Sequence, residues 1–164
     1  MGQTSVKTWQ LLLLMVLLPV AGWMAGHAWD QSYRILTAKN LIDQAWVCYQ
    51  KGEVRTSINL LEQALALDPY QYQAYRDLSG SYFKLTHQRR ISIMVCDRAM
   101  QFIPNDGRLQ EDLGRLHYLA GDFDLAVEHL QMAQKLLGPD SHEDELLDMA
   151  RHHAPVGGQT WSSN

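Results

Sequence analysis

The chain has 164 residues, 18 acidic and 14 basic side chains, and a formal net charge of −4. This length fits one small domain with additional segments, and charges of both signs exclude the strongly basic surface of a nucleic-acid-binding protein. The two cysteines, Cys48 and Cys96, belong to no Cys-x-x-Cys or Cys-x-x-Cys-His motif, so we expect two buried, unpaired thiols.

After a short tail (residues 1–8), the segment 9–29 is almost entirely apolar and begins and ends with tryptophan. A helix of this length crosses a hydrocarbon layer of about 30 Å, and tryptophan is enriched at both membrane interfaces. The pattern predicts a transmembrane helix over 9–29. A cleaved signal peptide is the alternative, because Lys7 precedes the apolar run and Gly26-His27-Ala28 resembles a cleavage site.

The distribution of charge around this segment gives a predicted orientation. Lys7 precedes it, and Arg34 and Lys39 follow it, which we interpret as a single-pass protein with a cytoplasmic N-terminus and an extracytoplasmic, periplasmic C-terminal domain. Small residues form one face of the predicted span, where another transmembrane helix could pack closely, although small residues are also common near the ends of spans. These residues are Ala21, Gly22, Ala25 and Gly26.

The remainder of the chain contains a repeating pattern. Pro69, Pro104 and Pro139 are spaced 35 residues apart, and an alanine precedes each one by five or six positions. Between them, apolar residues recur three and four positions apart, which predicts amphipathic helices and few strands. A fixed period of this length indicates helix pairs that bury their apolar faces by stacking on one another.

The pattern resembles the tetratricopeptide repeat (TPR), specifically that of a membrane-anchored bacterial-type TPR protein. The residues that carry the resemblance are Gly52, Ala64, Pro69, Ala99, Pro104, Gly114, Gly121 and Ala133. The resemblance implies an all-α fold with three helix pairs in residues 30–139, at about 38–71, 72–106 and 107–139. The second pair lacks a turn glycine, and we expect one extra residue in its turn.

Two segments follow the repeats. Residues 140–153 begin with a capping sequence and acids in the first turn, and we expect a helix that covers the exposed end of the solenoid. Residues 154–164 are predicted to be a flexible tail, unless a partner orders it around Trp161.

No sequence motif indicates catalysis, since there is no glycine-rich phosphate loop, Gly-x-Ser-x-Gly or His-Glu-x-x-His. The histidines His117, His129, His152 and His153 lack the spacing of metal ligands, because adjacent histidines on a helix point in different directions. We therefore expect no enzyme activity, metal, cofactor or small-molecule substrate.

The TPR resemblance implies a concave groove, lined by the first helix of each pair, that receives a protein partner. The groove positions are Lys39, Ile42, Trp46, Tyr49, Arg76, Phe83, Lys84, Arg108, Arg115 and Tyr118, with Tyr49 and Phe83 expected to pack between repeats. This mixture suits a ligand with apolar anchors and negative charge. In the chaperone-binding subgroup asparagines clamp a terminal carboxylate, but Trp46, Gly80 and Arg115 occupy those positions here.

These features lead to two hypotheses about function. The first is a membrane-anchored, non-catalytic scaffold for protein–protein interaction, acting as an accessory subunit or assembly factor of a larger membrane complex. The second is a cleaved, soluble periplasmic factor of the chaperone or envelope-assembly type.

Overall fold

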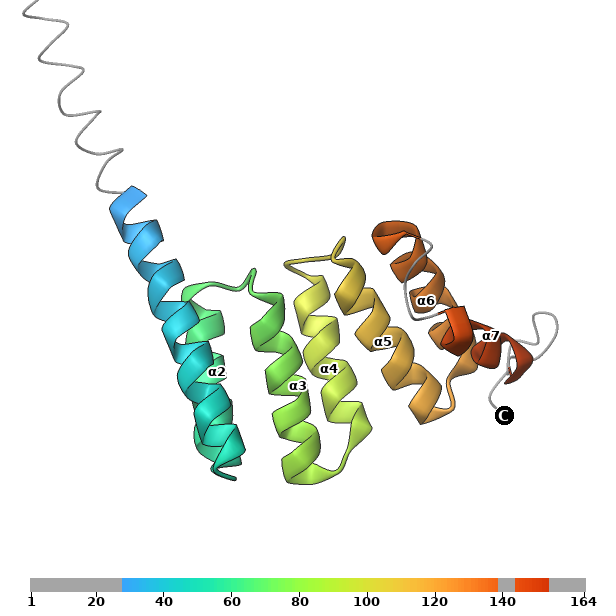
Figure 1. Ribbon diagram of the computed structural model, residues 1–164, viewed down its shortest axis with the longest axis horizontal. Helices are drawn as coiled ribbons and strands as arrows, with labels where there is room; N and C mark the ends of the chain where they lie inside the picture. The colour runs from blue at the N-terminus through green and yellow to red at the C-terminus, as the bar shows by residue number, and fades with distance from the viewer. Residues whose placement is uncertain (1–27, 139–143, 154–164) are drawn as a thin grey trace, which may run out of the picture. The chain divides into compact units, whose positions relative to one another are not determined.

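A computed structural model of the protein describes residues 28–138 and 144–153, all of whose regular elements are helices (Figure 1). A helix over residues 28–50 is followed by α2 (Val54–Leu67), α3 (Tyr72–Thr86), α4 (Arg89–Met100), α5 (Gly107–Ala120), α6 (Phe123–Leu137) and α7 (Asp144–His153). The chain divides into two units, Met1–Thr37 and Ala38–Asn164, and the second contains the helix pairs.

The predicted single-pass membrane architecture and localisation need correction. Within residues 28–138 and 144–153, no helix has both the length and the apolar character required to cross a membrane. The helix over residues 28–50 carries charges along its length, including Asp30, Arg34 and Asp43. The predicted span over 9–29 falls almost wholly on residues outside the described part of the chain, as do its small residues at 21, 22, 25 and 26.

Consecutive helices from residue 38 to α6 lie side by side, each packed mainly against the next one along the chain (Figure 1). Small residues lie at the points of contact: Ala64, Ala99 and Ala133 have no exposed surface. Leucines such as Leu61 and Leu78 fill the space around them. Ala64 and Ala99 belong to one core cluster, which continues from Ala38 to Leu113, so each helix pair depends on its neighbour for burial.

Two of the three hairpin turns use glycine in the left-handed conformation. Gly52 has φ +83° and Gly121 has φ +89°, values that side-chain-bearing residues rarely adopt. After each glycine the next amide turns back to the preceding helix; for example, Asp122 N donates to His117 O at 2.9 Å. This bonding satisfies carbonyls at the helix end.

The turn between α3 and α4 reaches the same conformation without glycine. His87 ends α3 with φ +56°, and its amide donates to Phe83 O at 2.8 Å. The turn comprises the two residues between α3 and α4, as many as lie between α5 and α6. The extra residue expected in this turn instead lengthens α3, which has 15 residues where α5 has 14.

Helix α5 is held close to α6 by two glycines. A Cβ on Gly114 would lie 2.6 Å from Leu130 Cγ, and one on Gly107 would lie 2.6 Å from Leu137 Cγ. Leu147 and Ala150 of α7 join Ala126 and Leu130 of α6 in a second core cluster. α7 therefore covers an apolar face of the last helix pair.

The two cysteines are unpaired. Cys96 is buried in the core, and burial raises the pKa of its thiol to about 12. Cys48 is only partly buried. A thiol with so high a pKa is protonated at neutral pH, so Cys96 acts as a small core residue.

Candidate functional site

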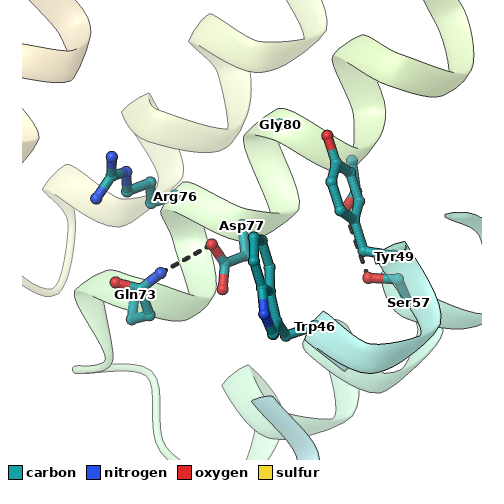
Figure 2. A pocket seen from close by; sticks show the side chains of 8 residues that line it. Trp46, Tyr49, Ser57, Gln73, Arg76, Asp77 and Gly80 are labelled. Atoms are coloured by element: carbon teal, nitrogen blue, oxygen red, sulfur yellow. Dashed lines mark hydrogen bonds between the residues drawn. The ribbon is translucent and has the colours of Figure 1, made fainter. Parts of the chain in front are cut away.

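A cavity of about 390 Å³ opens between the last turns of the 28–50 helix and the exposed face of α3 (Figure 2). Aromatic side chains form one side, polar side chains of α3 form the other, and two serines lie at its base. The lining residues are Trp46, Tyr49, Ser57, Gln73, Arg76, Asp77, Gly80 and Ser81. A cavity with apolar surface and a few polar groups is typical of a binding site.

The aromatic side of the cavity consists of two nearly parallel rings. Trp46 and Tyr49 have ring centroids 5.8 Å apart and an interplanar angle of 10°, and Trp46 remains 50% exposed. Lys84 of α3 fixes the tyrosine, because its Nζ lies 4.0 Å from the ring centroid and donates to Tyr49 O at 3.3 Å. Trp46 thus presents exposed apolar surface, and it stacks on a tyrosine ring that Lys84 holds in place.

The α3 side of the cavity is polar, and some of its polar groups are hydrogen-bonded to each other. Gln73 Nε2 donates to Asp77 Oδ1 at 2.8 Å (Figure 2). Burial raises the pKa of Asp77, while this hydrogen bond and the positive charge of Arg76 act in the opposite direction. The Ser57 and Ser81 hydroxyls lie 3.5 Å apart at the buried base.

A second hollow of about 220 Å³ continues the site along α3 towards α5. Its lining residues are Arg76, Ser79, Gly80, Asp112, Arg115, Leu116 and Leu119. Arg76 and Gly80 line both hollows, so the two form one continuous surface. We call this surface, comprising the lining residues of both hollows, the groove.

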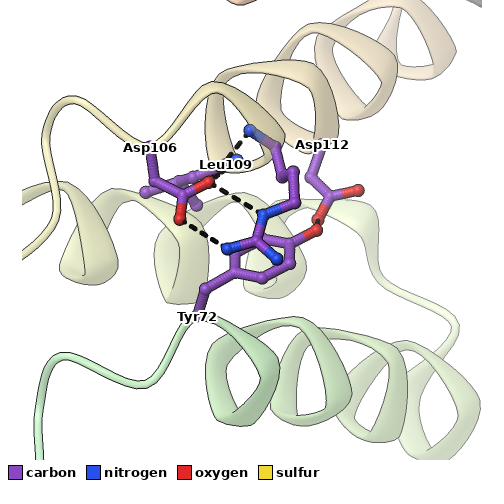
Figure 3. Close-up of polar contacts among 5 residues, drawn as sticks. Tyr72, Asp106, Leu109 and Asp112 are labelled. Carbon is purple, nitrogen blue, oxygen red and sulfur yellow. Dashed lines mark hydrogen bonds and ion pairs between the residues drawn. The ribbon is translucent and has the colours of Figure 1, made fainter. Parts of the chain in front are cut away.

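A hydrogen bond joins Tyr72 of α3 to Asp112 of α5, which lines the second hollow of the groove (Figure 3). Tyr72 Oη donates to Asp112 Oδ2 at 2.7 Å, and the guanidinium of Arg108 lies 4.4 Å from the Tyr72 ring centroid. Burial, followed by this hydrogen bond, raises the pKa of Tyr72, and burial raises the pKa of Asp112. The raised pKa keeps the Tyr72 hydroxyl protonated at neutral pH, so it remains the donor of the hydrogen bond that links the two helices of the groove.

The groove is less basic than the sequence pattern indicated. Arg108 Nη2 contacts Asp106 Oδ2 at 3.0 Å, and Arg115 Nη2 contacts Glu111 Oε1 at 2.6 Å. Asp77 and Asp112 also line the groove, and neither was among the predicted groove residues. Two of the predicted basic residues, Arg108 and Arg115, therefore form ion pairs with acidic side chains of the same chain.

The structure separates the predicted groove residues into several environments. Trp46, Tyr49, Arg76 and Arg115 line the groove. Ile42 does not, because it is only 7% exposed and belongs to the main core cluster. The remaining residues lie outside the lining. Lys39 and Phe83 are exposed, Lys84 and Arg108 contact tyrosine rings, and Tyr118 lies against Phe123 and His153.

Sequence reasoning missed Leu116, Leu119, Asp77 and Asp112 as lining residues. Leu116 and Leu119 follow the apolar period of α5 and look like core positions in the sequence.

Within the described residues, no group of three or more His, Cys, Asp or Glu side chains has the arrangement of a metal site. His117 and His129 instead stack on each other, with centroids 5.4 Å apart.

No protein-family model matches the sequence. The first TPR domain of Spaghetti (RPAP3), solved with an HSP90 peptide, is 15% identical, with a TM-score of 0.62, covering 72% of this chain and 93% of that one. The Yersinia enterocolitica type III secretion chaperone SycD, in complex with a YopD peptide, is 17% identical, with a TM-score of 0.55, covering 70% and 87%.

An O-GlcNAc transferase of Thermobaculum terrenum is 21% identical, with a TM-score of 0.60, and the match covers 75% of this chain but only 24% of the enzyme. Further matching structures include other TPR domains. At these identities the comparisons show the fold alone, which is that of a TPR domain.

Proposed function

We propose that the protein is a non-catalytic interaction scaffold whose groove binds a peptide segment of a partner protein. The observation that carries this proposal is the stacked pair of the exposed Trp46 and the half-buried Tyr49, which faces the polar side chains of α3 across the cavity. Aromatic side chains with exposed surface in a concave site are the usual anchors of peptide recognition.

The similar structures support the same type of ligand. The RPAP3 domain was solved with an HSP90 peptide, and SycD with a peptide of the translocator YopD. These ligands belong to those proteins, and their identities do not carry over at such low sequence identity. In this chain the groove holds a partner within a larger assembly, where the protein acts as an accessory subunit or an assembly factor.

Peptide selection tests the proposal and does not require the partner to be identified first. Random peptides displayed on phage are selected on the immobilised full chain, and the enriched peptides are synthesised and titrated by fluorescence anisotropy. Trp46→Ala is expected to raise the Kd about tenfold or more, as for an interface anchor. Trp29→Ala is the matched control, because this tryptophan is 78% exposed and lies outside the groove lining.

Equal binding by the wild type and Trp46→Ala would contradict the proposal, because the selected peptides would then bind elsewhere. A failure to enrich any peptide on the wild type would also contradict it.

A further inference from the structure

Most of the glycines within the described residues are required by the backbone conformation or by close packing. One of them is required by neither. Gly52, Gly121 and Gly138 have φ between +83° and +96°, a region that strains other residues. Gly107 and Gly114 lie in α5, where a Cβ would approach a leucine of α6 to 2.6 Å. Only Gly80, among these described glycines, has neither a positive φ nor a close neighbour.

Gly80 is an exposed residue in the interior of α3. A Cβ at this position would have no atom within 4 Å, so packing within the chain does not require glycine. Glycine inside a helix weakens the helix relative to alanine. Where glycine occurs at a surface without an internal reason, the remaining structural cause is the close approach of another molecule.

The surroundings of Gly80 define what that molecule presents. Gly80 lies where the two hollows of the groove join, with Trp46 and Tyr49 lining the first hollow. Leu116 and Leu119 line the second. Apolar surface therefore lies on both sides of a position that has no side chain of its own. This arrangement fits one large apolar side chain resting on the backbone of α3.

A positive charge lies beside this position. Arg76 is exposed, lines both hollows and makes no hydrogen bond or ion pair with another described residue. The nearby carboxylates of Asp77 and Asp112 already accept hydrogen bonds from Gln73 and Tyr72. Burial raises the pKa of both carboxyl groups, and the charge of Arg76 acts in the opposite direction without a hydrogen bond to either. Its guanidinium donors can therefore form a charge-assisted pair with a carboxylate of the ligand.

We propose that the groove recognises a peptide segment of a partner protein through two adjacent features, a large apolar side chain over Gly80 and an acidic side chain at Arg76. This inference rests on the proposed function and specifies its ligand. The open space above Gly80 acts as the specificity-determining feature, and the selected segment lies across α3 between the two apolar sides of the groove.

The test uses synthetic peptides enriched by phage selection on the wild-type chain. We expect them to share a Trp, Phe or Leu next to an Asp or Glu. Gly80→Leu fills the space above α3 and is expected to raise the Kd about tenfold or more. Ala66→Leu, which adds a leucine side chain at an exposed position of α2 outside the groove, is expected to leave it unchanged.

The charge contact is tested by a double-mutant cycle. The wild type should bind the acidic peptide more tightly than its Glu→Gln version, and Arg76→Gln should abolish that preference. A preference that persists in Arg76→Gln would overturn this half of the proposal.

The possible failures are distinguishable. If Trp46→Ala weakens binding but Gly80→Leu does not, the ligand specificity proposed here is overturned and the peptide-binding function stands. If Trp46→Ala has no effect, or no peptide is selected, both proposals are overturned. If the wild type without peptide is a dimer that Gly80→Leu dissociates, the occupant of the groove is a second copy of the chain, which also overturns the inference.

Discussion

The imidazole rings of His117 and His129 lie parallel between α5 and α6, with centroids 5.4 Å apart and an interplanar angle of 6°. His129 Nδ1 is 2.8 Å from Gln110 Oε1, which assigns a proton to that nitrogen because an amide oxygen only accepts. The charged groups around the pair are Asp122, 3.5 Å from His117 Nδ1, and Asp97 and Glu128 near His129.

The folded protein is expected to lose stability as the pH falls from about 7.5 to about 5.5. Burial, and then the neighbouring His117, lowers the pKa of His129 below its usual value of 6.5. Below pH 6.5 the unfolded chain therefore takes up this proton before the folded chain does, and the free energy of unfolding decreases. Urea unfolding across this range measures the slope.

His129→Phe removes the titrating group while keeping an aromatic ring against His117, so the slope should become smaller. His152→Phe is the control, because it removes an exposed histidine from α7. An unchanged slope in His129→Phe would show that other groups cause the pH dependence.

Alanine substitutions at two helical glycines should change stability in opposite directions. Gly80→Ala should raise the free energy of unfolding by about 1 kcal/mol, since alanine favours the helix and the new Cβ contacts nothing. Gly114→Ala should lower it by about 1–3 kcal/mol, because the Cβ would overlap Leu130. Urea denaturation measures both. A stabilising effect of Gly114→Ala would mean that α5 and α6 pack less closely than described.

Removal of the Tyr72 hydroxyl should destabilise the contact between α3 and α5. Tyr72→Phe keeps the ring beneath Arg108 but leaves the partly buried Asp112 carboxylate without its donor, at a cost of about 1–3 kcal/mol. Tyr70→Phe is the control, since this tyrosine is 67% exposed. Its effect should stay within about 0.5 kcal/mol by thermal unfolding. Equal effects of the two substitutions would contradict the assigned hydrogen bond.

Because His87 has a left-handed backbone conformation, glycine at this position should stabilise the protein. His87→Gly is expected to raise the free energy of unfolding by about 1 kcal/mol, because glycine adopts φ +56° without steric cost. His87→Val should lower it, since a β-branched residue disfavours positive φ. Thermal unfolding of the two variants gives the order. Greater stability of the valine variant would contradict the described turn.

The repeat fold could be predicted because its determinants are local and periodic. Ala64, Ala99 and Ala133 recur before prolines, and Gly52 and Gly121 mark turns that require positive φ. The turn between α3 and α4 was harder to predict because His87 adopts a positive φ, which is uncommon for residues other than glycine. The predicted transmembrane helix over 9–29 falls almost wholly outside the described residues, and within them no helix has the length and apolar character needed to cross a membrane.

The groove was only partly predictable. Helical phase brought Trp46, Arg76 and Arg115 to one surface, but it could not show that Ile42 is buried in the core. The pairing of Arg115 with Glu111 could have been found in the sequence, because the two residues are four positions apart on a predicted helix. The absence of a neighbour at Gly80 depends on the three-dimensional arrangement of side chains.

The Tyr72–Asp112 hydrogen bond has a kinetic consequence for any ligand of the groove. It fixes the spacing of α3 and α5 before a ligand arrives, so binding requires little rearrangement of these helices. Peptides should then associate at similar rates and differ mainly in residence time. Loosening the hydrogen bond by Tyr72→Phe would shorten residence even though this hydroxyl does not line the groove.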